Sequence, residues 1–354
     1  MKYKMNILYI TNLPSPYRVQ YFNELAKFCN LKVVFERESA SDRDERWKNN
    51  KQWLFDYIFL NGHKIKNDLS FSFRIKKYLN KQYDFIVFCN YSSPTEMIGI
   101  KYCQKRKIPY CIEADGAFFT KNRFKNRIKR NLLKKAIICF STCDNSDMYF
   151  SKLGVEKNRI FRYRFTSLNK NEILERNNDN YQINNSKKTL LYVGQFIHRK
   201  GIDILLRACV DLSNEYRLIL VGGKLNDELI KMTKNLKCEL IVEPFKTKEE
   251  LEYYFKIADV FVLPTREDIW GLVVNEALSY GLPTITTSAC NAGLELIKDG
   301  YNGFVITPNN VPELKKAISE IFKFTLKNNC FESIKDYTIE NMVLDHLTAL
   351  NHYE

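Results

Sequence analysis

Asp268 and Glu276 are two carboxylates, eight residues apart, in the stretch of the chain with the clearest capacity for chemistry. Residues 259–264 before them form an apolar run of strand length, and the segment around Glu276 has a helical composition that ends at Gly281. This order predicts that Asp268 lies where a parallel strand ends and that Glu276 lies about two turns into the next helix. The carboxylate of Glu276 can accept hydrogen bonds from two vicinal hydroxyls, such as those of a ribose.

Backbone amides and two cations provide a candidate anion site beside these carboxylates. Gly271 precedes the predicted helix, so the amides of Gly271, Leu272 and Val273 lack helical partners and suit a phosphate. Arg199 and Lys200 add positive charge in a loop that follows an earlier strand. Together these groups could hold a nucleoside diphosphate and stabilise its charge as it leaves. Each feature alone is commonplace on a protein surface, so the indication comes from their combination.

Strands and helices alternate in both halves of the chain, which predicts doubly wound α/β domains with parallel sheets and ligands at the carboxyl ends of the strands. The first strand is not followed by G-x-G-x-x-G, so the dinucleotide fingerprint of a dehydrogenase is absent. The predicted strands are residues 6–11, 31–36, 83–89, 109–114, 137–140, 160–165, 189–193, 216–221, 239–242, 259–264 and 281–287, and the predicted helices include 19–29, 202–212, 248–258 and 340–350.

The length of 354 residues favours two domains over one. Residues 169–185 contain seven asparagines and few large apolar side chains, a composition typical of a linker. We therefore expect a first domain at residues 1–166, a linker at 167–187, a second domain at 188–335 and a final amphipathic helix within 336–354. A cleft between the two domains would be the natural ligand site.

Composition limits the class of protein. Hydrophobic residues make up 45% of the chain, and no stretch reaches the roughly 18 apolar residues needed to span a bilayer. The N-terminal residues lack a small-residue cleavage site and favour a first strand over a signal peptide. Ten cysteines are scattered without a C-x-x-C pair, which favours buried thiols in a reduced, cytosolic chain. No cluster of residues has clear metal-ligand spacing.

Positive charge is concentrated in the first half. Residues 1–187 hold 36 Lys/Arg and 18 Asp/Glu, a balance of +18, whereas residues 188–354 hold 19 and 23, a balance of −4. Residues 121–135 alone contain eight basic side chains and no acid, with an apolar side chain at every fourth position from Phe124 to Ala136. This pattern fits a solvated surface helix or a helix lying on an anionic membrane. Nucleic-acid contact is the third alternative, although no other nucleic-acid motif supports it. The candidate membrane-contact residues are Arg127, Lys129, Arg130, Lys134 and Lys135.

The second half resembles the donor domain of family 4 glycosyltransferases, which have the GT-B fold of two Rossmann-like domains facing across a cleft. The matching segments are residues 194–201 (GQFIHRKG), 220–223 (LVGG), 253–265 (YYFKIADVFVLPT), 268–283 and 300–304 (GYNGF). The resemblance is strong from about residue 188 to residue 310 and weaker before them. It implies that the C-terminal helix packs back toward the N-terminal domain.

By this resemblance, the second half binds a nucleotide-sugar donor. Asp268 would face the hydroxyls of the sugar, Glu276 the ribose, and Arg199 and Lys200 the diphosphate. The family usually has Glu in place of Asp268 and Arg in place of Gln195. The other implied donor-binding residues are Gly194, Gly222, Gly223, Phe245, Gly271, Leu272 and Val273.

The resemblance assigns the acceptor to the first half. Asp115 ends a predicted strand where relatives often carry a His or an acid that faces the cleft, or it is a turn former before Gly116. Pro16 and Arg18 lie in the segment that corresponds to the family's first cleft loop, where Arg18 could touch phosphate or acceptor. His198 is better explained as a loop residue than as a base.

The implied reaction is a retaining transfer of a hexosyl group from a nucleotide sugar to a glycan or polyprenyl-linked acceptor, in the synthesis of a cell-surface polysaccharide. It implies neither a cofactor nor an obligatory metal, because Arg199, Lys200 and the helix dipole would stabilise the leaving diphosphate. We expect the acceptor to attack the sugar on the same face that the diphosphate leaves. We also expect a cytoplasmic protein that is peripheral to the inner face of the membrane. A sugar-nucleotide epimerase or a phosphorylase of the same fold and a basic nucleic-acid-binding protein are the alternatives.

Overall fold

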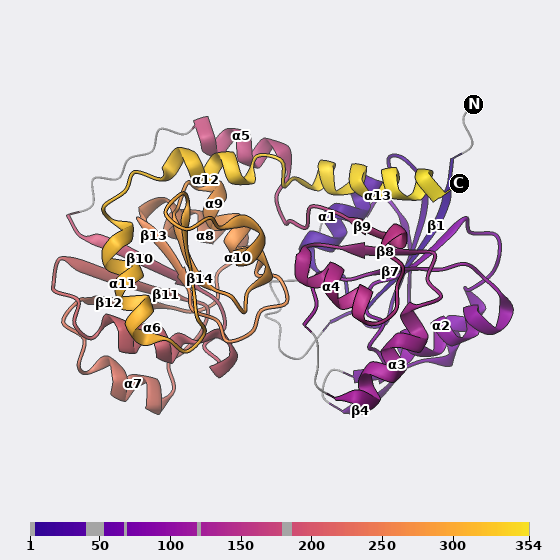
Figure 1. The fold of residues 1–354 in the computed structure, drawn as a ribbon, viewed down its shortest axis with the longest axis horizontal. Helices are drawn as coiled ribbons and strands as arrows, with labels where there is room; N and C mark the ends of the chain where they lie inside the picture. The colour runs from indigo at the N-terminus through magenta and orange to yellow at the C-terminus, as the bar shows by residue number, and fades with distance from the viewer. Residues whose placement is uncertain (1–3, 40–52, 67–68, 119–121, 179–185, 354) are drawn as a thin grey trace. The chain divides into compact units, whose positions relative to one another are not determined.

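The computed structural model describes residues 4–39, 53–66, 69–118, 122–178 and 186–353. The chain divides into two compact units (Figure 1). Unit 1 comprises Met1–Phe165 and Ile339–Glu354, and unit 2 comprises Thr166–Thr338. Each unit has its own parallel sheet with helices around it, so the predicted class of two doubly wound α/β domains is confirmed.

Unit 1 is built on seven parallel strands in the order β3-β2-β1-β6-β7-β8-β9. Residues 7–10 of β1 are fully buried, as expected for a strand that is covered on both faces. The order changes direction between β1 and β6, where open α/β sheets bind ligands at the carboxyl ends of their strands. The strands are β1 (Asn6–Thr11), β2 (Asn30–Phe35), β3 (Asp56–Phe59), β6 (Phe85–Phe88), β7 (Cys111–Glu113), β8 (Ile138–Ser141) and β9 (Ile160–Arg162).

The helices of unit 1 begin at caps that the sequence encodes. Ser93 accepts a hydrogen bond from the Glu96 amide at the start of α2, and Asn122 accepts one from the Lys125 amide at the start of α3. The helices are α1 (Pro16–Leu25), α2 (Pro94–Arg106), α3 (Arg123–Leu133), α4 (Asp144–Lys152) and α13 (Ile339–Tyr353). The smaller elements are the 3₁₀ helices η2 (Phe73–Lys77) and η3 (Lys157–Arg159) and the antiparallel pair β4 (His63–Lys66) and β5 (Leu69–Phe71).

The C-terminal helix α13 belongs to unit 1 and contacts α1. His346 of α13 is fully buried, and its ring centroid lies 4.3 Å from that of Phe140 and 4.5 Å from that of Tyr163. Asp345 accepts hydrogen bonds from the backbone amide of Arg164 at 3.0 Å and from its Nε at 2.8 Å. The prediction that the final helix packs with the N-terminal domain is therefore confirmed.

Unit 2 has six parallel strands in the order β12-β11-β10-β13-β14-β15. The apolar run that precedes Asp268 forms β13, and all four of its residues are buried. The strands are β10 (Lys188–Val193), β11 (Tyr216–Val221), β12 (Glu239–Glu243), β13 (Val260–Leu263), β14 (Thr284–Thr287) and β15 (Gly303–Ile306). The helices are α5 (Lys170–Asn178), η4 (His198–Lys200), α6 (Ile202–Cys209), α7 (Asp227–Thr233), α8 (Lys248–Ile257), α9 (Leu272–Ser279), α10 (Asn291–Leu296), α11 (Val311–Ile321) and α12 (Lys327–Ile334).

The segment 167–187, predicted as a linker, is partly structured. It contains helix α5, which contacts α9 and α12 of unit 2 and buries Ile173. Tertiary contacts therefore outweigh the polar, Asn-rich composition on which the prediction rested. Residues 179–185 of the predicted linker lie outside the described residues. The division between units falls at Phe165 and Thr166, close to the predicted boundary at residue 166.

Two further expectations concern thiols and membranes. All ten cysteines are free, and nine of them are buried. No helix in the described part of the chain combines the length and apolarity that crossing a bilayer requires.

A buried charge network ties the carboxyl edge of the unit 1 sheet to α1 and α13. Arg18 of α1 ion-pairs with Glu113 at the end of β7 and with Asp115 just beyond it. His346 Nε2 lies 3.3 Å from Glu113 Oε2. Burial opposes ionisation of Glu113, but the charge of Arg18 and the contact with His346 outweigh it and lower its pKa from 4.5 to about 2.

The low pKa of Glu113 predicts a pH-dependent contribution to stability. A pKa of about 2 against an ordinary 4.5 corresponds to roughly 3 kcal/mol, present above pH 4.5 and lost as the pH falls toward 2. Glu113→Gln is therefore expected to lower the free energy of unfolding by roughly that amount at pH 7 and by progressively less below pH 4.5, as measured by urea denaturation. Glu156→Gln, at an exposed ion pair, is the control and should change stability by less than about 0.5 kcal/mol. A deficit that is the same at pH 3 and pH 7 would contradict the ionic explanation.

Candidate functional site

Asp268 lies in the loop between β13 and α9, where the sequence places it. Its amide donates to the Ala289 carbonyl at 2.8 Å, and it forms a parallel bridge with Cys290. The loop is also held by α10, because the Asn291 side chain donates to the Ile269 carbonyl at 2.8 Å. The carboxylate is therefore presented from a backbone that β14 and α10 fix in position, with only 12% of the side chain exposed.

Arg199 and Lys200, at the end of η4, meet Asp268. Lys200 Nζ forms an ion pair with Asp268 Oδ2, and Arg199 Nη1 lies 3.9 Å from Asp268 Oδ1. Arg199 also donates to the Glu267 carbonyl at 2.8 Å. The three side chains carry a net charge of +1, so the cluster can still attract an anion although Lys200 is already paired. The structure thus brings together Asp268, Arg199 and Lys200, three of the four residues that the sequence suggests as catalytic; the fourth, Asp115, lies in unit 1.

Arg266 positions the loop that carries these cations, and sequence reasoning missed it. Its guanidinium donates to both carboxylate oxygens of Asp203 at 2.7 Å and to the His198 carbonyl at 2.6 Å. The amide of Arg266 and the hydroxyl of Thr265 donate to the Arg199 carbonyl at 2.8 and 3.0 Å. Burial alone would raise the pKa of Asp203, but the hydrogen bonds and charge of Arg266 lower it. The bidentate geometry fixes the loop rigidly.

Helix α9 begins with free amides beside Asp268. Its N-cap is Gly271, at φ 103°, and no side chain in the described part of the chain caps the helix. A Cβ at Gly271 would lie 2.7 Å from Cys290 Sγ, so both the backbone conformation and the space require glycine. The first amides of the helix, those of Leu272 and Val273, are therefore available to an anion, and the helix dipole favours negative charge there.

Glu276 lies on α9, but nearer to its start than the sequence indicated. The helix begins at Leu272, so Glu276 is about one turn, or roughly 6 Å, along it instead of two turns. Its Oε1 accepts a hydrogen bond from the Ser167 hydroxyl at 3.0 Å. Burial raises the pKa of Glu276, although the charge of Lys248 opposes this effect. Among the residues that the structure describes, no hydrogen bond or ion pair links Glu276 to Asp268 or Lys200. The candidate site therefore extends along the first turn of α9.

The glycines at the ends of β10 and β11 have a structural explanation. Gly222 is at φ 128°, and a Cβ there would lie 2.4 Å from the Gly194 carbonyl oxygen. A Cβ at Gly223 would lie 3.1 Å from the ring of Phe196. Close approach of the two strand ends accounts for these residues whether or not a ligand contacts them. Phe245, the remaining predicted donor-binding residue, is half-buried just after β12.

In unit 1, Asp115 is held at the carboxyl edge of the sheet with 27% of its side chain exposed. Besides the ion pair with Arg18, it accepts hydrogen bonds from the hydroxyls of Tyr17 at 3.1 Å and Tyr163 at 3.3 Å. Burial and the neighbouring Glu113 raise its pKa, against the charge of Arg18. Asp115 is therefore more than a turn former, because its carboxylate takes part in a specific network.

The sequence predicts that Pro16 and Arg18 lie in a cleft loop, but the structure places both of them in helix α1. Pro16 opens α1, where its fixed φ is compatible with the first helical turn and its missing amide hydrogen costs nothing. Arg18 is only 3% exposed, and its guanidinium is engaged by Glu113 and Asp115. Its structural role is to balance the buried carboxylate of Glu113 and the partly exposed carboxylate of Asp115.

The basic helix α3 packs with its apolar side inward. Leu132 and Leu133 are buried, and Ile128 packs against the core, whereas Phe124 is 73% exposed. The apolar stripe is thus largely occupied by the core, which favours a surface helix over one that inserts deeply. Among the predicted membrane-contact residues, Arg127, Arg130, Lys134 and Lys135 are exposed, while Lys129 Nζ lies 5.3 Å from the ring centroid of Tyr149.

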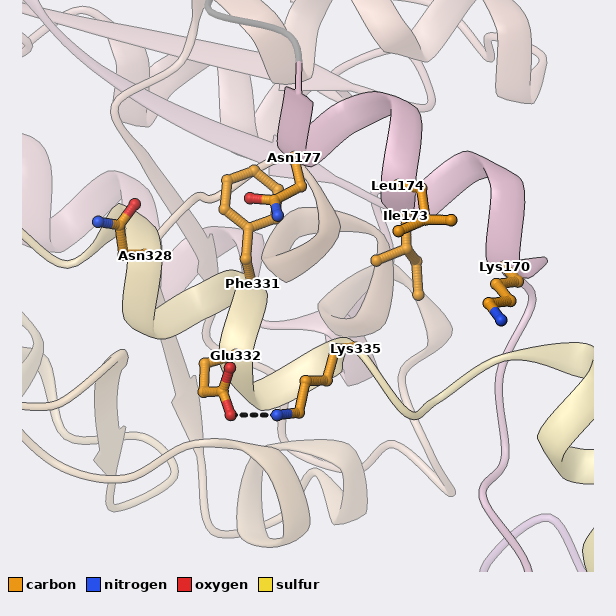
Figure 2. A pocket seen from close by; sticks show the side chains of 8 residues that line it. All are labelled: Lys170, Ile173, Leu174, Asn177, Asn328, Phe331, Glu332 and Lys335. Atoms are coloured by element: carbon orange, nitrogen blue, oxygen red, sulfur yellow. Dashed lines mark hydrogen bonds and ion pairs between the residues drawn. The ribbon is translucent and has the colours of Figure 1, made fainter.

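A groove of about 380 Å³ lies between α5 and α12 of unit 2 (Figure 2). Ile173, Leu174 and Phe331 supply its apolar surface, and Glu332 and Lys335 form an ion pair at its edge (Figure 2). The rest of its lining is Lys170, Asn177 and Asn328. None of the predicted site residues lines this groove. Within the described ranges, no group of three or more His, Cys, Asp or Glu could hold a metal ion.

Known proteins that are similar to this chain include glycosyltransferases. Residues 175–333 match the family model "Glycosyl transferases group 1". An uncharacterised glycosyltransferase of Methanocaldococcus jannaschii is 28% identical over 270 residues, covering 73% of each chain. The N,N'-diacetylbacillosaminyl-diphospho-undecaprenol alpha-1,3-N-acetylgalactosaminyltransferase of Campylobacter jejuni is 23% identical over 84% of this chain and 83% of that protein. Matches to two further relatives span about half of their lengths.

Similarity extends to the whole fold. The structure of Anabaena HepE in complex with UDP superimposes with a TM-score of 0.76, at 16% sequence identity, over 98% of this chain and all of the other. The two doubly wound units, in this order, have the GT-B fold. Residues 175–333 are similar to the group 1 glycosyltransferases, and the relatives found by sequence include proteins named as glycosyltransferases.

Proposed function

We propose that the protein is a retaining glycosyltransferase that moves a hexosyl group from a nucleotide sugar to a glycan or polyprenyl-linked acceptor in cell-surface polysaccharide synthesis. The observation that carries this proposal is the uncapped start of α9 beside the cluster of Arg199, Lys200 and Asp268. An anion of two phosphates matches a site that offers free amides, two cations and a helix dipole.

Six candidate residues of unit 2 have roles in this proposal. The amides of Leu272 and Val273 and the side chains of Arg199 and Lys200 bind the diphosphate and stabilise its charge as the bond to the sugar breaks. Asp268 receives hydroxyls of the sugar, and Glu276 receives the two hydroxyls of the ribose. The acceptor attacks from the face that the diphosphate leaves, and the departing phosphate takes the acceptor's proton. No metal and no cofactor is required.

Two relatives support the substrate classes. Anabaena HepE was solved with UDP bound, which favours a nucleotide sugar as the donor. The Campylobacter jejuni relative carries undecaprenol in its name, which favours a polyprenyl-linked acceptor. Unit 1 would supply the acceptor-binding residues, with Asp115 as the candidate contact, because its carboxylate is held at the carboxyl edge of the sheet and is 27% exposed. None of the comparisons favours an epimerase or a nucleic-acid-binding protein.

A panel of UDP-, GDP- and ADP-sugars, followed by thermal unfolding in the presence of EDTA, tests the donor class. The donor should raise the melting temperature of the protein by a few degrees when it is present at about 100 times its Kd. EDTA ensures that any shift is independent of divalent metal. If none of the sugar nucleotides shifts the transition, the protein is not a nucleotide-sugar enzyme of this kind.

We also propose that the protein acts at the inner face of the membrane, which it contacts through cations of α3 and of the two residues that follow it, Lys134 and Lys135. Replacing Lys129, Arg130, Lys134 and Lys135 with Gln should weaken binding to vesicles containing phosphatidylglycerol at least ten-fold, because each cation near an anionic surface contributes about 1 kcal/mol. Sedimentation with vesicles measures the effect. The control replaces Lys231, Lys234, Lys237 and Lys316, four exposed lysines of unit 2, with Gln. Equal binding by the two variants would refute membrane contact through α3.

A further inference from the structure

Glu276 is held by a residue outside α9, at the start of unit 2. The Ser167 hydroxyl donates to Glu276 Oε1 at 3.0 Å, and the side chain of Ser167 is nearly buried, at 7% exposed. Ser167 is the second residue of unit 2, directly after the chain leaves unit 1. A hydrogen bond to a partly buried carboxylate constrains its orientation.

Ser167 is itself fixed in place. Lys248, the first residue of α8, donates from Nζ to the Ser167 carbonyl at 2.9 Å. The same Nζ forms an ion pair with Glu172 of α5 at 2.6 Å. The neighbouring Leu168 amide donates to the Thr166 hydroxyl at 3.1 Å. The serine therefore has a defined backbone position from which its hydroxyl can orient Glu276.

The far end of α9 is clamped by the same helix α5. Arg176 Nη1 donates to the Ser279 hydroxyl at 2.5 Å, and the guanidinium carbon lies 4.1 Å from the ring centroid of Tyr280. Arg176 also lies 3.5 Å from Glu172, which links this clamp to Lys248. The turn of α9 that carries Glu276 is therefore braced on one side by α5 and on another by Ser167.

We propose that Ser167 is a positioning residue that orients the Glu276 carboxylate toward the two ribose hydroxyls of the donor; this rests on the proposed function. The serine hydroxyl uses one lone pair of Oε1. The second lone pair of Oε1 and both lone pairs of Oε2 are then directed to receive a vicinal diol. Without the serine, the carboxylate rotates about its last side-chain bond. Binding of the diol must then order the carboxylate, and the lost entropy reduces the affinity.

The test compares ribonucleoside diphosphates with analogues that lack the diol. Binding of UDP, GDP and ADP and of their 2′,3′-dideoxy forms is measured by calorimetry for the wild type, Ser167→Ala and Ser167→Thr. For whichever base binds, Ser167→Ala should weaken the ribonucleotide about ten-fold and change the dideoxy form by less than two-fold. Ser167→Thr retains a hydroxyl and should recover most of the affinity.

Three results would overturn the proposal. Ribonucleotide binding by Ser167→Ala that equals the wild type would remove any role for the serine. If Ser167→Ala loses the same affinity for the ribonucleotide and for the dideoxy form, the serine only stabilises the fold. The same conclusion follows if Ser167→Thr does not recover affinity for the ribonucleotide. Wild-type protein that binds none of the ribonucleotides would instead refute the proposed function itself, and the role of Ser167 with it. If Ser167→Ala fails to fold, Lys248→Met, which frees the Ser167 carbonyl, should give the same ribo-specific loss.

Discussion

Glu276→Ala is expected to lose at least a hundred-fold in affinity for the nucleoside diphosphate and to show no thermal shift with any sugar nucleotide. The wild-type carboxylate would accept two charge-assisted hydrogen bonds from the ribose, and such bonds contribute about 1.5–3 kcal/mol each. Leu272, Val273 and Val274, which precede Glu276 in that turn, are apolar and cannot accept these hydrogen bonds through their side chains. Calorimetry with the nucleotide identified by the panel measures the loss.

The matched control for this variant is Glu228→Ala, which removes an exposed carboxylate of α7 in the same unit. It should bind the nucleotide as the wild type does. A Glu276→Ala protein that keeps its melting temperature and still binds the nucleotide sugar normally would show that the ribose assignment is wrong.

Lys200→Met should reduce the rate of sugar transfer by roughly a hundred- to a thousand-fold, with a much smaller effect on melting temperature. Removing one preorganised donor to a developing negative charge costs about 2.7–4 kcal/mol of transition-state stabilisation in other enzymes. Met preserves most of the volume of the Lys side chain, which is only 15% exposed. Steady-state release of nucleoside diphosphate from the donor measures the rate, and Lys316→Met is the exposed control.

The double variant Lys200→Met with Asp268→Asn separates two explanations for that loss. The reference is Asp268→Asn alone, because the asparagine also weakens the proposed contact with the sugar. If Lys200 acts on the leaving phosphate, the double variant is roughly a hundred-fold slower than Asp268→Asn. If Lys200 serves only to neutralise Asp268 through their ion pair, the two variants have similar rates. A double variant within ten-fold of Asp268→Asn would therefore contradict the phosphate role.

Much of the fold follows from local sequence signals. The central strands β1, β10, β11 and β13 are continuous apolar runs between turn residues, so their positions could be predicted closely. Strand β3 was missed because its residues are exposed or only partly buried at the edge of the sheet, where the apolar signal is weak. Helix α5 was missed because the Asn-rich stretch that contains it is stabilised by contacts with α9 and α12 instead of by its own propensity.

The site was predictable to the extent that its residues are close in sequence or follow adjacent strands. Arg199, Lys200 and Asp268 each follow a strand, and β10 and β13 are neighbours in the sheet, so their loops had to meet. The bonds that position them could not be found in this way. Arg266 and Asp203 are 63 residues apart, and Ser167 and Glu276 are 109 apart. No local pattern specifies contacts of such separation.

For Arg18, the sequence predicted an exposed site residue, and the structure shows a buried, ion-paired one. Its place after a Pro-rich turn favoured an exposed cation that could bind phosphate, but the pairing with Glu113 and Asp115 depends on where β7 ends relative to α1. Buried carboxylates near a sheet edge need a cation, and only the assembled unit shows which one is within reach. The cleft-loop interpretation of Arg18 is therefore replaced by a structural role.

The position of the diphosphate in a crystal grown with the donor nucleotide and EDTA tests the central claim most directly. The β-phosphate should lie within hydrogen-bond distance of the Leu272 and Val273 amides and of Lys200 Nζ, with the ribose hydroxyls on Glu276 and no metal ion between the phosphates. A diphosphate bound away from the start of α9, or held there only through a divalent ion, would contradict it.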